Sequence, residues 1–324
     1  MQPAAIRNPR PTHKKQASRS FMLQNRNKLA MNTAVQTLLQ RDSLFLVIEL
    51  RALWVSIALQ MLAAMAYLRW LISPRDKTGR SARRLLFTAT LILSLIILCR
   101  TVQAGRPPYQ TLYESLLWFS WSALLAYLVV ERSFESIHAA GFPVAVIAAA
   151  ACLYAVLGRD PALEPLPPAL QSQWFLWHVI IAFISYAVFV VAFAVELAHV
   201  SLVGLLPYRI LKRYRMESEA AARFHRSAHR LVLFGFPLLT FGIVTGAAWA
   251  EQAWGRYWSW DPKETWSLIT WTVYALYLHA MTMGRWRGGR ASALNILGFV
   301  CMVMTFLGVN WISRLLGIPS LHAY

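Results

Sequence analysis

The sequence predicts an all-α integral membrane protein with about eight transmembrane helices. Of its 324 residues, 57% are hydrophobic and only 14% are charged, whereas soluble domains carry roughly 25% charged residues. Apolar runs of about 20 residues, the length that spans a bilayer as a helix, recur along the chain. The expected spans are roughly 52–71, 85–103, 111–130, 139–157, 174–203, 231–250, 266–283 and 294–313.

The individual runs differ in character. The run at 231–250 has no charged residue, whereas 85–103 has only 15 uncharged residues between Arg84 and Arg100. The run at 174–203 is longer than the hydrocarbon core requires, so we expect one of its ends to project into water.

Basic residues predict the orientation. The connecting segments 69–84, 131–138, 207–230 and 284–292 carry 17 Lys and Arg, and the alternate segments carry 6. The first set should therefore be cytoplasmic, which places residues 251–265 and both termini outside. Because the net charge of +18 is spread over such short loops, it indicates contact with membrane lipid and no nucleic-acid partner.

The N-terminal region conflicts with this orientation. Residues 1–51 carry nine Lys and Arg, although eight spans place them outside. Either the first helix does not span, or the true start is Met31, and we hypothesise the later start. We accordingly expect 1–43 to be a basic tail, disordered or wrongly assigned, and 44–324 to be the membrane domain.

Tryptophan is concentrated between the sixth and seventh spans. Six tryptophans lie within 23 positions: Trp249, Trp254, Trp258, Trp260, Trp266 and Trp271. An interfacial belt uses one or two such rings at a helix end. This density predicts a large, flat, apolar ligand at the membrane surface, and with histidines nearby haem is the first candidate.

Three histidines are candidate iron ligands. His178, at the outer end of the fifth span, and His322, beyond the eighth, could hold one haem from both sides. His279 follows Trp266 by 13 residues, or about 20 Å of helix, and lies within the membrane. It could supply half of a second site, completed by another subunit. The alternatives are headgroup contacts for His178 and His322 and an interhelical hydrogen bond for His279.

The other polar candidates have structural alternatives. His225 and His229 have the i, i+4 spacing of metal ligands, but the basic segment 217–230 favours a helix lying on anionic lipid. For His199 we expect packing or snorkelling.

Asp261 and Pro262 fit the start of a helix, with Asp261 as the N-cap. Arg256 and Lys263 are candidate partners of haem propionates. Glu114 could bind a group in a cavity or lie at the membrane boundary.

The Trp-rich segment resembles a known signature. WGRYWSWDPKETWSLITWTVYALYLH is similar to the WWD signature of the CcsA (ResC) family of cytochrome c biogenesis proteins, part of system II. PPYQTLYESLLWFSW, WFLWHV and FLGVNWISRLLGIPSLHAY also resemble the family, so the likeness extends from about residue 100 to the end.

The resemblance implies an eight-helix protein with a WWD segment (249–266) facing outward. Such a protein would act with a CcsB (ResB) partner to deliver haem b, its substrate, to CXXCH sites of apocytochrome c, as a subunit of a holocytochrome c synthase (haem lyase). His178 and His322 match the external haem ligands and His279 the transmembrane ligand. In the WWD segment the expected haem contacts are Trp249, Trp254, Trp258, Trp260 and Asp261.

The implied location is a bacterial inner membrane, with the WWD segment and the C-terminus in the periplasm, or else a thylakoid. Two other functions compete. A transporter gated by tryptophans predicts broken helices and symmetric halves, and neither is visible in the sequence. A haem-binding scaffold or regulator without ligation activity fits the same residues.

Overall fold

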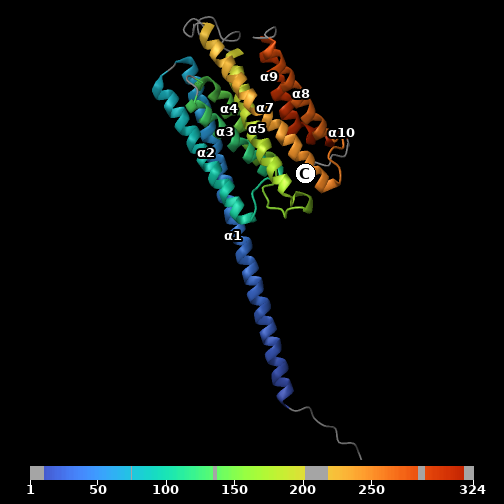
Figure 1. Ribbon diagram of the computed structural model, residues 1–324. Helices are drawn as coiled ribbons and strands as arrows, with labels where there is room; N and C mark the ends of the chain where they lie inside the picture. Colours follow the sequence, from blue (N-terminus) through green and yellow to red (C-terminus); the bar gives the residue numbers. More distant parts are fainter. Residues whose placement is uncertain (1–10, 74, 134–136, 201–217, 284–288, 317–324) are drawn as a thin grey trace, which may run out of the picture. The chain divides into compact units, whose positions relative to one another are not determined.

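The computed structural model describes residues 11–73, 75–133, 137–200, 218–283 and 289–316 (Figure 1). The chain divides into two compact units, Met1–Arg51 and Ala52–Tyr324. All regular structure in the described ranges is helical, which confirms the all-α class. The elements are α1 (Pro11–Ile72), α2 (Asp76–Ala104), α3 (Leu112–Ser133), α4 (His138–Gly158), the 3₁₀ turn η1 (Pro168–Leu170), α5 (Gln173–Val200), α7 (Ser218–Trp254), α8 (Pro262–Thr282), α9 (Gly289–Val303), the π-helical turn η3 (Met304–Gly308) and α10 (Val309–Leu316).

Within the described residues, each predicted span overlaps a helix or, for the eighth, the continuous stretch of α9, η3 and α10. Seven of these helices are long and apolar enough to cross a membrane. The exception among the described residues is α8, which has 21 residues but contains Lys263, Glu264 and several threonines. The count of eight spans, the basic tail 1–43 and the start at Met31 stay predictions.

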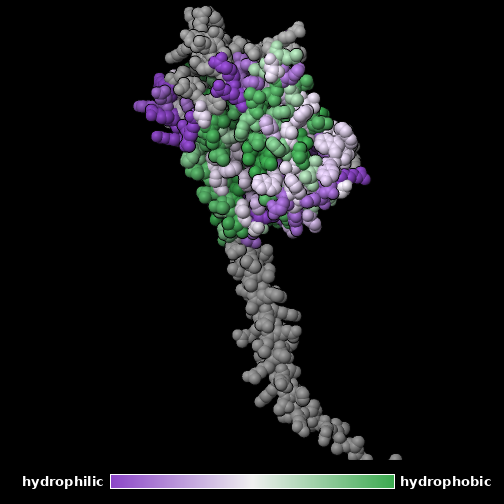
Figure 2. All heavy atoms as spheres, viewed as in Figure 1, coloured by the Kyte–Doolittle hydropathy of each residue, from purple (hydrophilic) through white to green (hydrophobic). Residues whose placement is uncertain are grey.

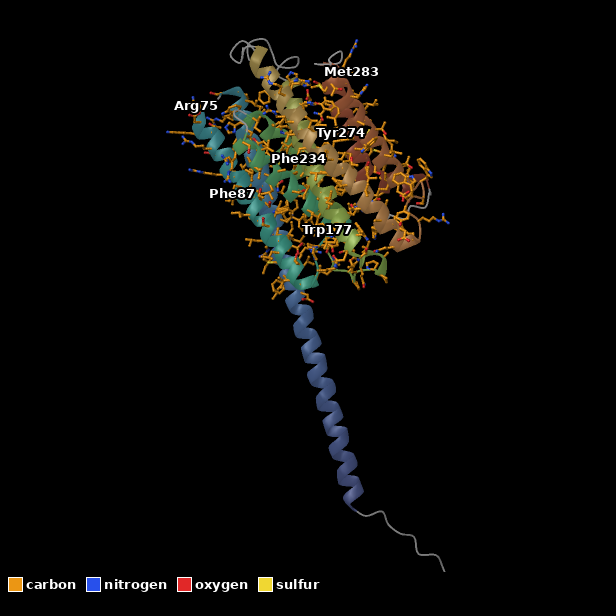
Figure 3. All side chains as sticks on the ribbon, viewed as in Figure 1. Arg75, Phe87, Trp177, Phe234, Tyr274 and Met283 are labelled. Atoms are coloured by element: carbon orange, nitrogen blue, oxygen red, sulfur yellow. The ribbon has the colours of Figure 1, made fainter. Side chains whose placement is uncertain are left out.

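The polar ends of the second unit are separated by an apolar band. Hydrophobic side chains cover the middle of its helices, and the most hydrophilic ones gather towards the two ends (Figure 2). Arg75, before α2, and Met283, after α8, lie at one end, and Trp177 of α5 lies at the other (Figure 3). A bundle of membrane-spanning helices produces this pattern of an apolar middle and two polar ends.

Helix α5 is the centre of the bundle. It contacts α3, α4, α7 and α9, and its most extensive contact is with α7. Its buried side chains include Phe189, Val190 and Val191, which have no exposed surface. Because α5 touches four helices, residues at its two ends can meet residues from several others.

Glycines allow α7 to lie close against α5. A Cβ on Gly235 would lie 3.0 Å from the Phe189 ring, and one on Gly246 would lie 2.7 Å from Nδ1 of His178. Gly242 and Gly246 form a G-x-x-x-G pattern, which brings membrane helices together. The close approach lets the Ser185 hydroxyl donate to the Gly235 carbonyl oxygen at 3.2 Å.

A buried carboxylate holds the loop between α2 and α3 in place. Glu114 has no exposed side-chain surface and pairs with Arg100 at 3.4 Å and Arg106 at 3.2 Å. It also accepts a hydrogen bond from the Gln110 backbone N–H at 2.8 Å. The sequence left open whether Glu114 binds a ligand or lies at the boundary. In the structure it neutralises two arginines and fixes the loop that carries Tyr109.

Replacing this carboxylate should destabilise the fold. Glu114→Ala leaves two converging arginines without their counterion, and breaking a buried pair in this way costs about 3–5 kcal/mol. We expect a clearly lower Tm in detergent. Glu251→Ala, at an exposed position of α7, is the matched control and should change stability by less than about 0.5 kcal/mol. Equal Tm values for the two variants would contradict the assignment.

Candidate functional site

A cavity of about 170 Å³ lies beside the N-terminal part of α5. Its walls come from α3, α5, α7, α8 and η3, from the loop before α3 and from the loop between α7 and α8. They are mainly aromatic and small residues, with few polar groups. The lining residues include Tyr109, Phe175, His178, Trp249, Trp258 and Lys263.

His178 is held in one orientation at this cavity. Its Nδ1 lies 2.8 Å from the carbonyl oxygen of Gly242. Because a carbonyl oxygen only accepts hydrogen bonds, Nδ1 carries the proton and the basic lone pair is on Nε2. This is how proteins fix the tautomer of a histidine that binds a metal.

Trp249 supports the His178 ring. The two rings are stacked, with centroids 5.9 Å apart and planes 17° from parallel. Trp249 is 2% exposed, and its indole N–H donates to the Ala169 carbonyl oxygen at 2.8 Å. The absence of a Cβ at Gly246 leaves the space that the imidazole occupies. His178 is thus confined on several sides by rigid groups.

The tryptophans do not form a single flat surface. Trp249 and Trp258 line the cavity, whereas Trp254 packs on Trp249 in a small apolar cluster with Leu170. Trp260 is 68% exposed and meets Trp258 edge to face at 5.8 Å. The positive φ of Trp260, 58°, is uncommon for a bulky residue and marks a sharp turn before α8. Ligand contacts by Trp254 and Trp260 stay a prediction.

Asp261 starts α8, which confirms its expected role as N-cap. Its carboxylate accepts a hydrogen bond from the Lys263 backbone N–H at 2.9 Å, and Pro262 occupies the first turn. Glu264 completes a capping box by accepting from the backbone N–H of Asp261 at 3.2 Å. The cap therefore fixes Lys263 and Glu264 at the cavity wall.

Lys263 brings a cation to this wall. Burial lowers the pKa of its ammonium group, and the nearby carboxylate of Asp261 opposes that shift. Arg256, the other predicted propionate partner, is exposed and does not line the cavity.

Neither of the other two predicted ligands is seen at the cavity. His279 is exposed on α8 and does not line the cavity. His322 lies outside the described residues. Among the described residues the structure therefore places His178, but not His279, with Trp249 and Trp258.

One group of polar residues was missed by the sequence analysis. The prediction of a separate surface helix at 217–230 is wrong from Ser218 onwards. That part and the predicted sixth span form a single helix, α7. His225 contacts Glu196 of α5 at 3.1 Å instead of facing lipid. Glu196 was not singled out, although its i, i+3 spacing from His199 was a usable signal.

The bundle and its histidine-containing apolar cavity define a polytopic membrane protein with a cavity at one end. The chain belongs to the cytochrome c assembly protein family, whose pattern matches residues 109–316. It is a cytochrome c biogenesis protein.

Similar proteins carry the corresponding names. "Cytochrome c biogenesis protein CcsA" of Parasynechococcus marenigrum (strain WH8102) is 35% identical over 289 residues, covering 82% of this chain and 93% of that protein. The CcsA of Chlamydomonas reinhardtii is 34% identical over 254 residues, 75% of this chain and 67% of that protein. The solved structure of "Cytochrome c Heme Lyase CcmF" superposes with a TM-score of 0.60 at 20% identity, covering 79% of this chain and 46% of that one. This last likeness shows a shared fold.

The lysine at the cavity gives a testable prediction. Because burial lowers the pKa of Lys263, competitive acetylation with mass spectrometry should show it becoming reactive at a lower pH than exposed Lys77. Asp261→Asn removes the charge that opposes the shift and keeps a capping side chain. It should move the midpoint lower still. A Lys263 midpoint at or above that of Lys77 would contradict the assigned environment.

Proposed function

We propose that this chain binds haem in the cavity beside the WWD segment and presents it for covalent attachment to apocytochrome c. The observation that carries the proposal is the fixed imidazole of His178, with Nδ1 bonded to Gly242 and the ring stacked on Trp249. A histidine whose Nδ1–H is engaged offers Nε2 to iron.

The cavity walls suit a porphyrin. Tyr109, Phe175 and Trp258 provide aromatic surface, and Lys263 provides a cation for a propionate. The volume of about 170 Å³ is below the roughly 300 Å³ at which small-molecule pockets begin. Haem would therefore be only partly enclosed, with one edge accessible to a second protein.

Two further ligands belong to the proposal. His322 would be the second axial ligand of this haem. His279, exposed on α8, would bind a haem within the membrane together with a histidine from a CcsB (ResB) partner. An outward-facing histidine fits a site shared between subunits.

The chemistry requires positioning more than acid–base groups. Each cysteine S–H of a CXXCH site adds across a haem vinyl group, so that a C–S bond and a C–H bond form and no net redox change occurs. The histidine of that site would replace one axial ligand. The contribution of this chain, as a subunit of a holocytochrome c synthase, is to orient the haem and exclude water from one of its faces.

This function places the WWD segment and the C-terminus in the periplasm of a bacterium, or in a thylakoid lumen. A scaffold or regulator that binds haem b without delivering it is the alternative. Retained haem without stimulation of holocytochrome c formation, in cells that contain the CcsB partner, would favour that alternative.

Removing the axial ligand tests the proposal directly. His178→Ala, expressed with a CcsB-type partner, should lose most haem at the outer site and most holocytochrome c assembly. Added imidazole should restore part of both, because it fills the vacated ligand position. His138→Ala, at the other end of the bundle, should retain haem. Unchanged haem and assembly in His178→Ala would reject the site.

A pair of glycine variants tests the orientation of His178. A Cβ at Gly246 would lie 2.7 Å from the imidazole, whereas the nearest atom to a Cβ at Gly242 is 3.8 Å away. Gly246→Ala should weaken haem binding by about 10–100-fold, the usual effect of disturbing a ligand's support. Gly242→Ala should bind like the wild type in a spectroscopic titration, and equal losses in both variants would contradict the geometry.

A further inference from the structure

A second group of ligand-type side chains lies at the opposite end of the α5 and α7 pair. Glu196 and His199 come from α5 and His225 from α7, and one ligand atom from each lies within 4.8 Å of the others. The Glu196 side chain has no exposed surface, and both imidazoles are 13% exposed. His199 follows His178 by 21 residues, or about 30 Å of helix, so this group is separate from the cavity.

The spacing of these atoms matches the coordination sphere of a small cation. Nδ1 of His199 and Nδ1 of His225 lie 3.3 Å and 3.1 Å from the same oxygen, Oε1 of Glu196. Around a tetrahedral zinc ion with bonds of about 2.0–2.1 Å, neighbouring ligand atoms are about 3.3 Å apart. A metal ion could therefore enter with small side-chain movements.

One oxygen of Glu196 is approached by more hydrogen-bond donors than it has lone-pair sites. The Ser292 hydroxyl of α9 also donates to Oε1 of Glu196, so three donors converge on an oxygen with about two lone-pair sites. Asn295 donates to the other carboxylate oxygen at 3.4 Å.

Two polar atoms of this group lack a partner. Among the described residues, Nε2 of His225 and Oδ1 of Asn295 are buried without a hydrogen bond. Such atoms are costly, so the hydrogen bonds within this group do not account for all of its buried polar atoms.

We propose that Glu196, His199 and His225 bind a divalent transition metal ion of the Zn²⁺ class. Two imidazoles and one carboxylate are a common zinc donor set, with a fourth position for water or another oxygen ligand. The ion takes the place of the proton on each Nδ1, which moves to Nε2 of the same ring or, from a protonated imidazole, is released to solvent. It ties α5 to α7 at the end remote from His178. This site goes beyond the proposed haem function and does not depend on it.

A similar buried carboxylate provides the matched control. Oε1 of Glu131 lies 2.7 Å from Nδ1 of His138. It accepts hydrogen bonds from the hydroxyls of Tyr67 and Tyr127 at 3.0 and 3.1 Å. Among the described residues this cluster has one imidazole, so it lacks the donor set for a zinc site.

The test uses the full chain in detergent, stripped with a chelator and re-equilibrated with Zn²⁺. Metal content after desalting should be one Zn²⁺ per chain, and X-ray absorption at the zinc edge should count two imidazole ligands. In competition with a chromophoric chelator, Glu196→Gln, His199→Gln and His225→Gln should each weaken binding by at least tenfold. His138→Gln should bind like the wild type.

Several outcomes would overturn the proposal. They are a wild-type chain without stoichiometric Zn²⁺, zinc that survives in the His199→Gln/His225→Gln double variant, and equal loss in His138→Gln. Size-exclusion profiles identify any variant that fails to fold, and the ligand count of the wild-type chain decides in that case.

Discussion

The close antiparallel contact between α5 and α7 is the interaction on which the site depends. Glycines at 235, 242 and 246 remove the side chains that would hold these helices apart. Their absence exposes backbone carbonyl oxygens, and those of Gly235 and Gly242 accept hydrogen bonds from α5. In an apolar environment such bonds have few competitors, so the contact also fixes the register of the two helices.

This register determines which residues meet at each end of the pair. At one end it places the His178 ring between the Gly242 carbonyl and Trp249, next to the cavity. At the other end it brings His225 to Glu196. The Glu114 ion pairs hold the loop before α3 at the cavity, and the capping box at Asp261 holds the start of α8 there. Helix α5 thus supplies the candidate ligand, and neighbouring helices together with the adjoining loops supply the apolar surface around it.

Much of this could be predicted from the sequence, because the relevant signals are local. Apolar runs gave the positions of the helices, and Asp261 followed by Pro262 gave the start of α8. The association of His178 with the Trp-rich segment followed from depth along a helix. Residues whose partners lie on another helix could not be placed in this way. The pairing of Arg100 with Glu114 and that of Glu196 with His225 depend on interhelical register, which hydropathy does not encode. The prediction of a helix on the lipid surface at 217–230 was wrong for a similar reason. The basic composition of this segment was visible in the sequence, but its continuity with the following span in α7 was not.

The most direct measurement is a cryo-electron microscopy map of the chain, co-expressed with a CcsB-type protein, in lipid nanodiscs after purification from haem-replete cells. The account predicts planar density in the cavity, lying against Trp249 and Trp258, with the iron bonded to Nε2 of His178 and one porphyrin edge exposed. An empty cavity in a preparation that carries haem elsewhere, or haem in the cavity with its iron away from His178, would contradict it.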